Sequence, residues 1–90
     1  MTNEQKQILR EAAITILADN PARAFTSAEL ERRIRQRQMA DGQWNEADLR
    51  EALALLEGLG FVAKAHAPLG YSLQFQATAQ GVLFRERNLP

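Results

Sequence analysis

The hydrophobic pattern of the chain changes period once, at Gly58-Leu59-Gly60, and this change constrains the fold more than any other feature. Before it, apolar residues recur every three to four positions, as they do on one face of an α-helix. After it, apolar and polar residues alternate, as they do along a strand with one buried face. A chain of 90 residues without cysteine has room for one core and depends on packing for its stability. We therefore expect a single α+β domain over residues 1–90, with the helices first.

The first helix is expected over residues 3–19. Six apolar side chains recur there at spacings that place them on one stripe of a helix. Asn20 ends the helix because a residue that precedes proline avoids the α region. The side chains expected to pack are Ile8, Leu9, Ala12, Ala13, Ile16 and Leu17.

The second and third helices begin with the same local signal. Thr26 is placed as an N-cap and Glu29 completes a capping box, and Asn45 stands in the same relation to Asp48. The second helix should run to about Gln38 and the third to about Gly58, with Asp41-Gly42 as the turn between them. Two apolar pairs would staple the helix starts, namely Phe25 with Leu30 and Trp44 with Leu49. The second helix should bury Ala28, Leu30 and Ile34, and the third Leu49, Ala52, Leu53, Leu55, Leu56 and Leu59.

The segments "FVAKAHA" and "YSLQFQAT" flank a Pro-Leu-Gly turn and predict a β-hairpin. In the second strand, Tyr71, Leu73 and Phe75 should share the packed face. The remaining "TAQGVLFRERN" predicts a short helix capped by Thr78, although Gly81 lowers its helix propensity. Its side chains available for packing are Val82, Leu83 and Phe84.

The order of these elements resembles the winged helix–turn–helix domain. The stretch "NEADLREALALLEGLGFV", from Asn45 to Val62, is similar to the third helix and following strand of bacterial winged-helix regulators. In "YSLQFQATAQG" the sequence resembles the second wing strand and the Thr-x-x-Gly start of the next helix in the same families. The resemblance implies three helices, a β-hairpin wing and a short C-terminal helix. It also implies that the third helix enters the DNA major groove while the hairpin tip touches the backbone or the minor groove.

Candidate DNA-binding residues lie on both sides of the Asp41-Gly42 turn. The arginines of the second helix would hold phosphates without reading sequence, and a lysine near the hairpin tip would do the same. In the third helix, an asparagine and an arginine suit adenine and guanine edges. The candidate set is Arg32, Arg33, Arg35, Arg37, Asn45, Arg50 and Lys64. These side chains also have local partners, since Glu29 could pair with Arg33, Glu31 with Arg35, and Glu46 or Glu57 with Arg50.

The third helix departs from the DNA-reading pattern because it carries four acidic residues and one arginine between Asn45 and Gly58. The whole chain has no net charge, with eleven basic and eleven acidic residues, which disfavours non-specific binding to a polyanion. Two hypotheses remain open. The first is a small winged-helix DNA-binding protein, a transcriptional regulator that acts as a homodimer through its last helix and its first. The second is a winged-helix module for protein–protein interaction or dimerisation that docks a protein partner through the third helix.

Other function classes have little support in the sequence. No Ser/His/Asp or Cys/His set and no phosphate-cradling glycine loop is present, so we expect neither an enzyme nor a cofactor. His66 is the one histidine of a chain without cysteine, which argues against a metal site. The N-terminus carries charges throughout and predicts neither a signal peptide nor a membrane span. We therefore expect a cytoplasmic protein without a membrane partner.

Overall fold

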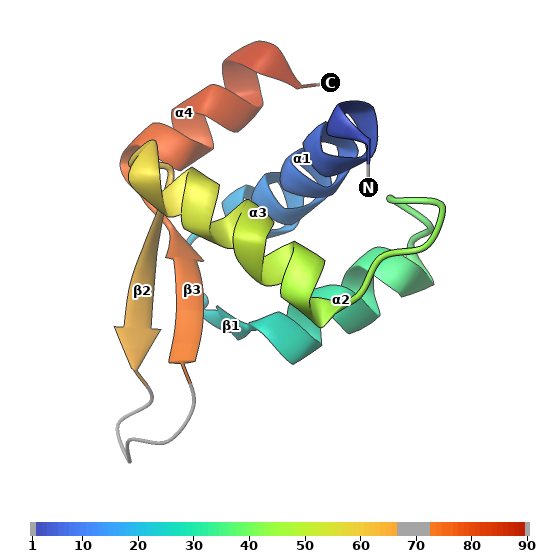
Figure 1. The fold of residues 1–90 in the computed structure, drawn as a ribbon. Helices are drawn as coiled ribbons and strands as arrows, with labels where there is room; N and C mark the ends of the chain where they lie inside the picture. The colour runs from blue at the N-terminus through green and yellow to red at the C-terminus, as the bar shows by residue number, and fades with distance from the viewer. Residues whose placement is uncertain (1, 67–72, 90) are drawn as a thin grey trace.

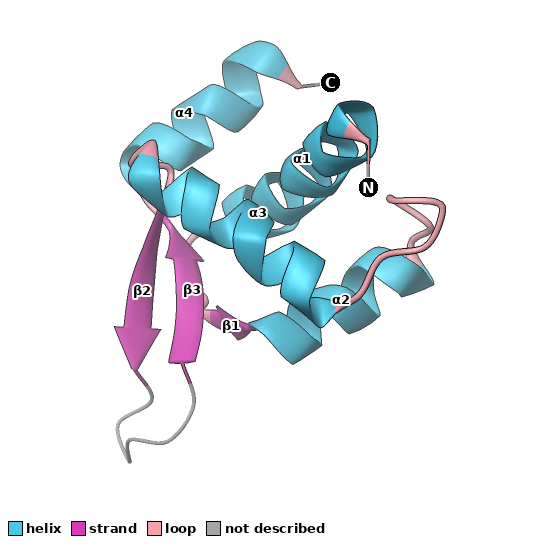
Figure 2. Cartoon of the chain, in the orientation of Figure 1, coloured by secondary structure: helices cyan, strands magenta, loops and turns pink. Residues whose placement is uncertain are grey.

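The computed structural model describes residues 2–66 and 73–89 (Figure 1). The elements in chain order are α1 (Asn3–Asp19), β1 (Phe25–Thr26), α2 (Ser27–Gln36), α3 (Glu46–Gly58), β2 (Val62–His66), β3 (Leu73–Ala77) and α4 (Ala79–Asn88). The strands form one antiparallel sheet in the order β1-β3-β2, and the helices pack beside it (Figure 2). Four helices and a three-stranded antiparallel sheet agree with the expected α+β class. The expected Pro-Leu-Gly turn, with Tyr71, lies outside the described residues.

Both predicted capping boxes are present. Thr26 accepts from the main-chain nitrogen of Glu29 at 3.1 Å, and Asn45 accepts from that of Asp48 at 3.0 Å. α3 ends at Gly58, as expected. α2 ends at Gln36, two residues earlier than predicted, because Gln38 takes a left-handed φ of 52°.

The early end of α2 is a Schellman motif. The main-chain nitrogen of Gln38 donates to the carbonyl of Arg35 at 3.2 Å, and that of Met39 donates to the carbonyl of Ile34 at 3.1 Å. These two bonds satisfy carbonyls that the helix would otherwise leave open. Met39 then packs against the core.

Strand β1 was not predicted from the sequence. Phe25 pairs with Phe75 and Thr26 with Gln74, which adds a third strand to the hairpin beside β3. Phe25 is fully buried. It therefore joins the sheet to the start of α2 as well as flanking the cap.

The core lies where α1, α2 and α3 meet the sheet. Its largest fully buried side chains are Phe25, Leu9, Ile14, Ile16, Leu17, Leu30, Ile34, Leu49 and Leu53. The prediction of which side chains pack was wrong at several positions. Ala28 is exposed, and five larger side chains are between 39% and 54% exposed, namely Ile8, Leu55, Leu59, Leu73 and Leu83.

Within residues 2–66 and 73–89, the neighbouring elements leave these side chains partly uncovered. Leu73 begins β3 and pairs only with His66, since β1 reaches no further than Gln74. Leu55 and Leu59 lie at the end of α3, and both line an apolar groove between α1, α3 and α4. The apolar arc of α3 is therefore wider than the surface that its neighbours bury.

Helix α4 packs against the end of α3 through a hydrogen bond and an aromatic stack. The hydroxyl of Thr78 caps α4 by accepting from the nitrogen of Gly81 at 3.1 Å, and it donates to the carbonyl of Gly60 at 2.6 Å. Phe84 stacks on Phe61 with ring centroids 4.6 Å apart. Gly81 is buried, and a Cβ added there would overlap the carbonyl oxygen of Phe61. The glycine that lowers helix propensity thus permits the close approach of α4.

Candidate nucleic-acid interface

Helix α3 runs from beside α2 to the top of the β2–β3 hairpin (Figure 1). Its side towards the start of α2 and strand β3 is called its outer side below. A shallow groove runs along this side at the first turns of α3. Its walls come from the start of α2, the start of α3 and strand β3, and the lining residues are Thr26, Ser27, Ala28, Glu46, Arg50, Leu73 and Phe75. This is the surface that a winged helix would offer to a DNA groove.

Glu46 holds the only carboxylate among the residues that line this groove. Its Oε1 accepts hydrogen bonds from Ser27 Oγ and from Arg50 Nη2, each at 2.7 Å. The hydrogen bond from Ser27, and then that from Arg50, lowers the pKa of Glu46 below its ordinary value. The carboxylate is therefore ionised at neutral pH and neutralises Arg50. This confirms the predicted pairing of Arg50 with Glu46.

Asn45 stands at the start of the same helix. Its side-chain oxygen accepts from the nitrogen of Asp48, and its main-chain nitrogen donates to Asp48 Oδ2 at 2.9 Å. Bidentate pairing with adenine needs both the oxygen and the nitrogen of the asparagine amide. While Asn45 caps α3, only its side-chain NH₂ group is available for such a contact.

Arg35 joins the end of α2 to the start of α3. Its Nη2 donates to the carbonyl of Trp44 at 2.8 Å and to Glu31 at 3.3 Å, which confirms the predicted pair with Glu31. The guanidinium carbon lies 4.1 Å from the centroid of the Trp44 ring. Trp44 is buried and donates through Nε1 to the carbonyl of Ala40. Arg35 thus has a structural role that the sequence did not predict.

Four residues of α2 form one row at spacings i, i+3, i+4 and i+7, and this row lines a polar cleft with an arginine from the preceding loop. The lining residues are Arg23, Glu29, Arg32, Arg33 and Gln36, and this site is called the arginine cleft below. At about 100° per residue, the row lies on the flank of α2 away from Ser27 and Arg35, which contact the start of α3.

The pairing in the arginine cleft differs from the prediction. Glu29 binds Arg23 at 3.0 Å, so the expected pair of Glu29 with Arg33 was wrong. Arg33 instead lies over the ring of Phe25, with its guanidinium carbon 5.0 Å from the centroid. Arg23 was missed because it lies in a connection without periodicity, where the sequence gives no face for a side chain.

The seven candidate residues therefore do not form one continuous surface. Arg32 and Arg33 line the arginine cleft, Arg37 caps the end of α2, and Arg35 contacts Trp44. The groove at the start of α3 holds Arg50. Lys64, on β2, lies 3.6 Å from Glu57 near the other end of α3.

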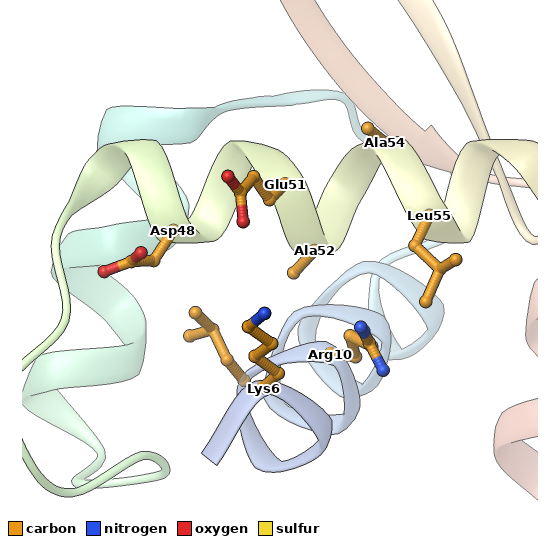
Figure 3. Close-up of a pocket in the computed structure, with 8 residues that line it drawn as sticks. Lys6, Arg10, Asp48, Glu51, Ala52, Ala54 and Leu55 are labelled. Carbon is orange, nitrogen blue, oxygen red and sulfur yellow. The ribbon is translucent and has the colours of Figure 1, made fainter. Parts of the chain in front are cut away.

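A second groove separates α1 from α3. Figure 3 shows Lys6 and Arg10 on α1, with Asp48 and Glu51 on α3. Two cations and two carboxylates leave this groove without net charge.

Within residues 2–66 and 73–89, no group of three or more histidine, cysteine, aspartate or glutamate side chains is placed to hold a metal ion. None of the helices in the described ranges is both long and apolar enough to cross a membrane.

No protein-family model matches the chain, and no curated protein matches it. Solved structures do resemble it. A double mutant of Lactococcus lactis ZitR has a TM-score of 0.68 at 16% identity and covers 87% of this chain, while the chain covers 47% of it. A single mutant of the same protein has a TM-score of 0.62 at 17% identity, with coverages of 96% and 49%.

The ferric uptake regulator of Vibrio cholerae has a TM-score of 0.58 at 17% identity, with 79% of this chain and 52% of that chain covered. The chain thus spans about half the length of the structures it matches. At this identity the likeness concerns the fold. Four helices with a three-stranded antiparallel sheet, in this order, are consistent with a winged helix.

Proposed function

We propose that this chain is a winged-helix domain that binds double-stranded DNA and serves in the regulation of transcription. The observation that carries the proposal is the arrangement of α2, α3 and the β2–β3 hairpin, with the outer side of α3 open beside the hairpin. The Vibrio cholerae ferric uptake regulator, which resembles this chain in fold, has DNA-binding domains. The proposal agrees with the expected cytoplasmic location.

In this function, the phosphate contacts come from the arginines of α2 and from Lys64. The side chains of Arg32 and Arg37 make no hydrogen bond or ion pair within the part of the chain that the structure describes, so their charges are available. Arg50 approaches the bases together with the free NH₂ group of Asn45. Its pair with Glu46 is exposed, and exposed pairs are weak enough to exchange for a stronger partner.

A salt-resolved titration tests the proposal. A fluorescent duplex of about 20 bp with mixed sequence is titrated with the protein in about 50 mM salt, and binding is followed by anisotropy. We expect binding at micromolar protein, with an affinity that falls linearly on a log–log plot as salt rises. No anisotropy change on any duplex at this salt would overturn the proposal.

A second candidate is an interaction module that docks a protein partner through α3. It is favoured by the charge of α3, which carries four carboxylates and one cation, Arg50, and by the exposed Leu55. Glutamates beside phosphates are repelled, whereas a basic protein surface would attract them. Replacing Glu51 with Gln would weaken such a complex and leave duplex binding unchanged or slightly stronger, which separates the two functions.

We also propose that the chain acts as a homodimer, because two copies related by a twofold axis match a palindromic DNA site. The dimer contact expected through α4 has fewer exposed apolar side chains than the sequence predicts. Phe84 is stacked on Phe61 inside the domain, and Val82 is half-buried, which leaves Leu83 as the exposed apolar side chain of the three. Sedimentation equilibrium of the wild type and of Leu83→Ser tests this, since a monomeric wild type would contradict it.

A further inference from the structure

We propose that the arginine cleft binds a phosphate of the nucleic-acid backbone, and that Arg23 is a DNA-binding residue beside Arg32 and Arg33. DNA would then contact the outer flank of α2 and the loop before β1, and not the outer side of α3 alone. This inference rests on the proposed function, because it assigns the phosphate to duplex DNA.

The cleft brings together side chains from two segments. Arg23 comes from the loop that follows α1, while Arg32, Arg33 and Gln36 come from one face of α2. Gln36 adds an amide donor to the three guanidinium groups. Arginine presents a planar fork of N–H donors that fits two phosphate oxygens at once, which a point charge does not.

Two of the three arginines are already held in place. The guanidinium carbons of Arg23 and Arg33 lie 4.6 Å and 5.0 Å from the centroid of the Phe25 ring. Phe25 is fully buried and is fixed by its pairing with Phe75 in the sheet. A guanidinium stacked on a ring keeps the N–H groups at its edge free for an anion. Ordering these side chains therefore costs little when a phosphate binds.

Glu29 fixes Arg23 in a second way. One carboxylate oxygen accepts from Thr26 in the capping box, and the other accepts from Arg23 at 3.0 Å. Because the capping box holds the carboxylate, Arg23 is attached to the rigid start of α2. Arg32 is exposed, and its side chain has no hydrogen bond or ion pair to any residue in the described ranges.

The charge balance separates this cleft from the outer side of α3. Three arginines and one glutamate line the cleft, which leaves an excess of positive charge. On α3, Arg50 is paired with Glu46, which already neutralises it. Lys64 is likewise beside Glu57. Since affinity for DNA comes mainly from cations that replace counterions at phosphates, the cleft is the better site for the backbone.

The test compares single variants by salt-resolved duplex binding. Arg23→Gln and Arg32→Gln each remove one cation from the cleft. Arg87→Gln is the matched control, because Arg87 is an exposed arginine of α4 that lines neither the arginine cleft nor the groove at the start of α3. Each lost phosphate contact should lower the slope of log affinity against log salt by about 0.9, and should weaken binding roughly tenfold in about 50 mM salt. The control should match the wild type in both, and thermal unfolding confirms that each variant folds.

Three outcomes would overturn the inference. If the wild type binds DNA and both cleft variants bind equally well, the phosphate lies elsewhere, and the proposed function stands. If the wild type binds no duplex, the inference fails together with the proposed function. If inorganic phosphate shifts the NMR signals of Arg32 and Gln36 but duplex does not, the cleft holds a small phosphate and not the DNA backbone.

Discussion

Replacing Gly81 with Ala should destabilise the domain, although the same change in an ordinary helix stabilises it. In a helix interior alanine is favoured over glycine by about 1 kcal/mol. At Gly81 an added Cβ would overlap the carbonyl oxygen of Phe61 and would lie 3.2 Å from Cδ1 of Ile14. Since Phe61 contributes backbone and not the end of a flexible side chain, α4 must move away from the end of α3.

The cost of this movement can be estimated from the contacts it strains. Overpacking of this kind costs about 1–3 kcal/mol. The hydrogen bond from Thr78 to the carbonyl of Gly60, 2.6 Å long, would be lengthened, which costs about 1 kcal/mol more. After the gain in helix propensity, we expect Gly81→Ala to lower the free energy of unfolding by about 1–3 kcal/mol. For a domain of this size each kcal/mol corresponds to roughly 4–8 °C in Tm.

Gly58→Ala is the control for this prediction. Gly58 is the last residue of α3, is exposed, and has no atom within 4 Å of an added Cβ. Alanine there should be neutral or stabilising by up to about 1 kcal/mol. Urea and thermal unfolding of both variants measure the difference. If Gly81→Ala is as stable as the wild type or more so, the close packing of α4 on the end of α3 is refuted.

The remaining predictions concern three hydrogen-bonded side chains. Thr78→Ala removes the cap of α4 and should lower the free energy of unfolding, measured in urea, by about 1–2 kcal/mol. Thr78→Ser should keep most of that stability, and equal losses in the two variants would contradict this. Ser27→Ala should raise the pKa of Glu46 towards its ordinary value in an NMR titration, because the hydrogen bond from Ser27 is the largest cause of its lowering. Since the pKa of Glu46 is lowered by folding, its contribution to stability is present above its unfolded pKa and is lost as pH falls through the lowered one. Ser27→Ala should make that loss of stability smaller. An unchanged dependence of stability on pH would count against this role of Ser27. Arg35→Lys should lose the planar stack on Trp44 and about 1 kcal/mol of stability, with a red shift of tryptophan fluorescence as the check; no shift would contradict the stacked geometry.

Local signals predicted the starts of the helices well. The capping boxes at Thr26 and at Asn45 depend on residues three positions apart, so the sequence alone contains the whole interaction. The pairs of Glu31 with Arg35 and of Glu46 with Arg50 are local in the same sense. Such contacts need no knowledge of the tertiary fold.

Contacts between distant segments were not predictable in this way. Strand β1 has two residues and exists because Phe25 meets Phe75, fifty positions later in the chain. Periodicity assigned Leu55 to an apolar face, but exposure depends on whether another helix covers that face. Arg23 belongs to a loop, so its place in the arginine cleft follows only from the fold.

In the proposed function, DNA binds to the side of the domain that carries α2 and the hairpin. The most direct measurement is an NMR titration of the isotope-labelled protein with an unlabelled duplex of about 20 bp in about 50 mM salt. We expect the largest amide shifts in residues 23–37, with further shifts at the start of α3 and in the hairpin. An absence of shifts, or shifts confined to α4 and the end of α3, would show that DNA does not bind to this side of the domain.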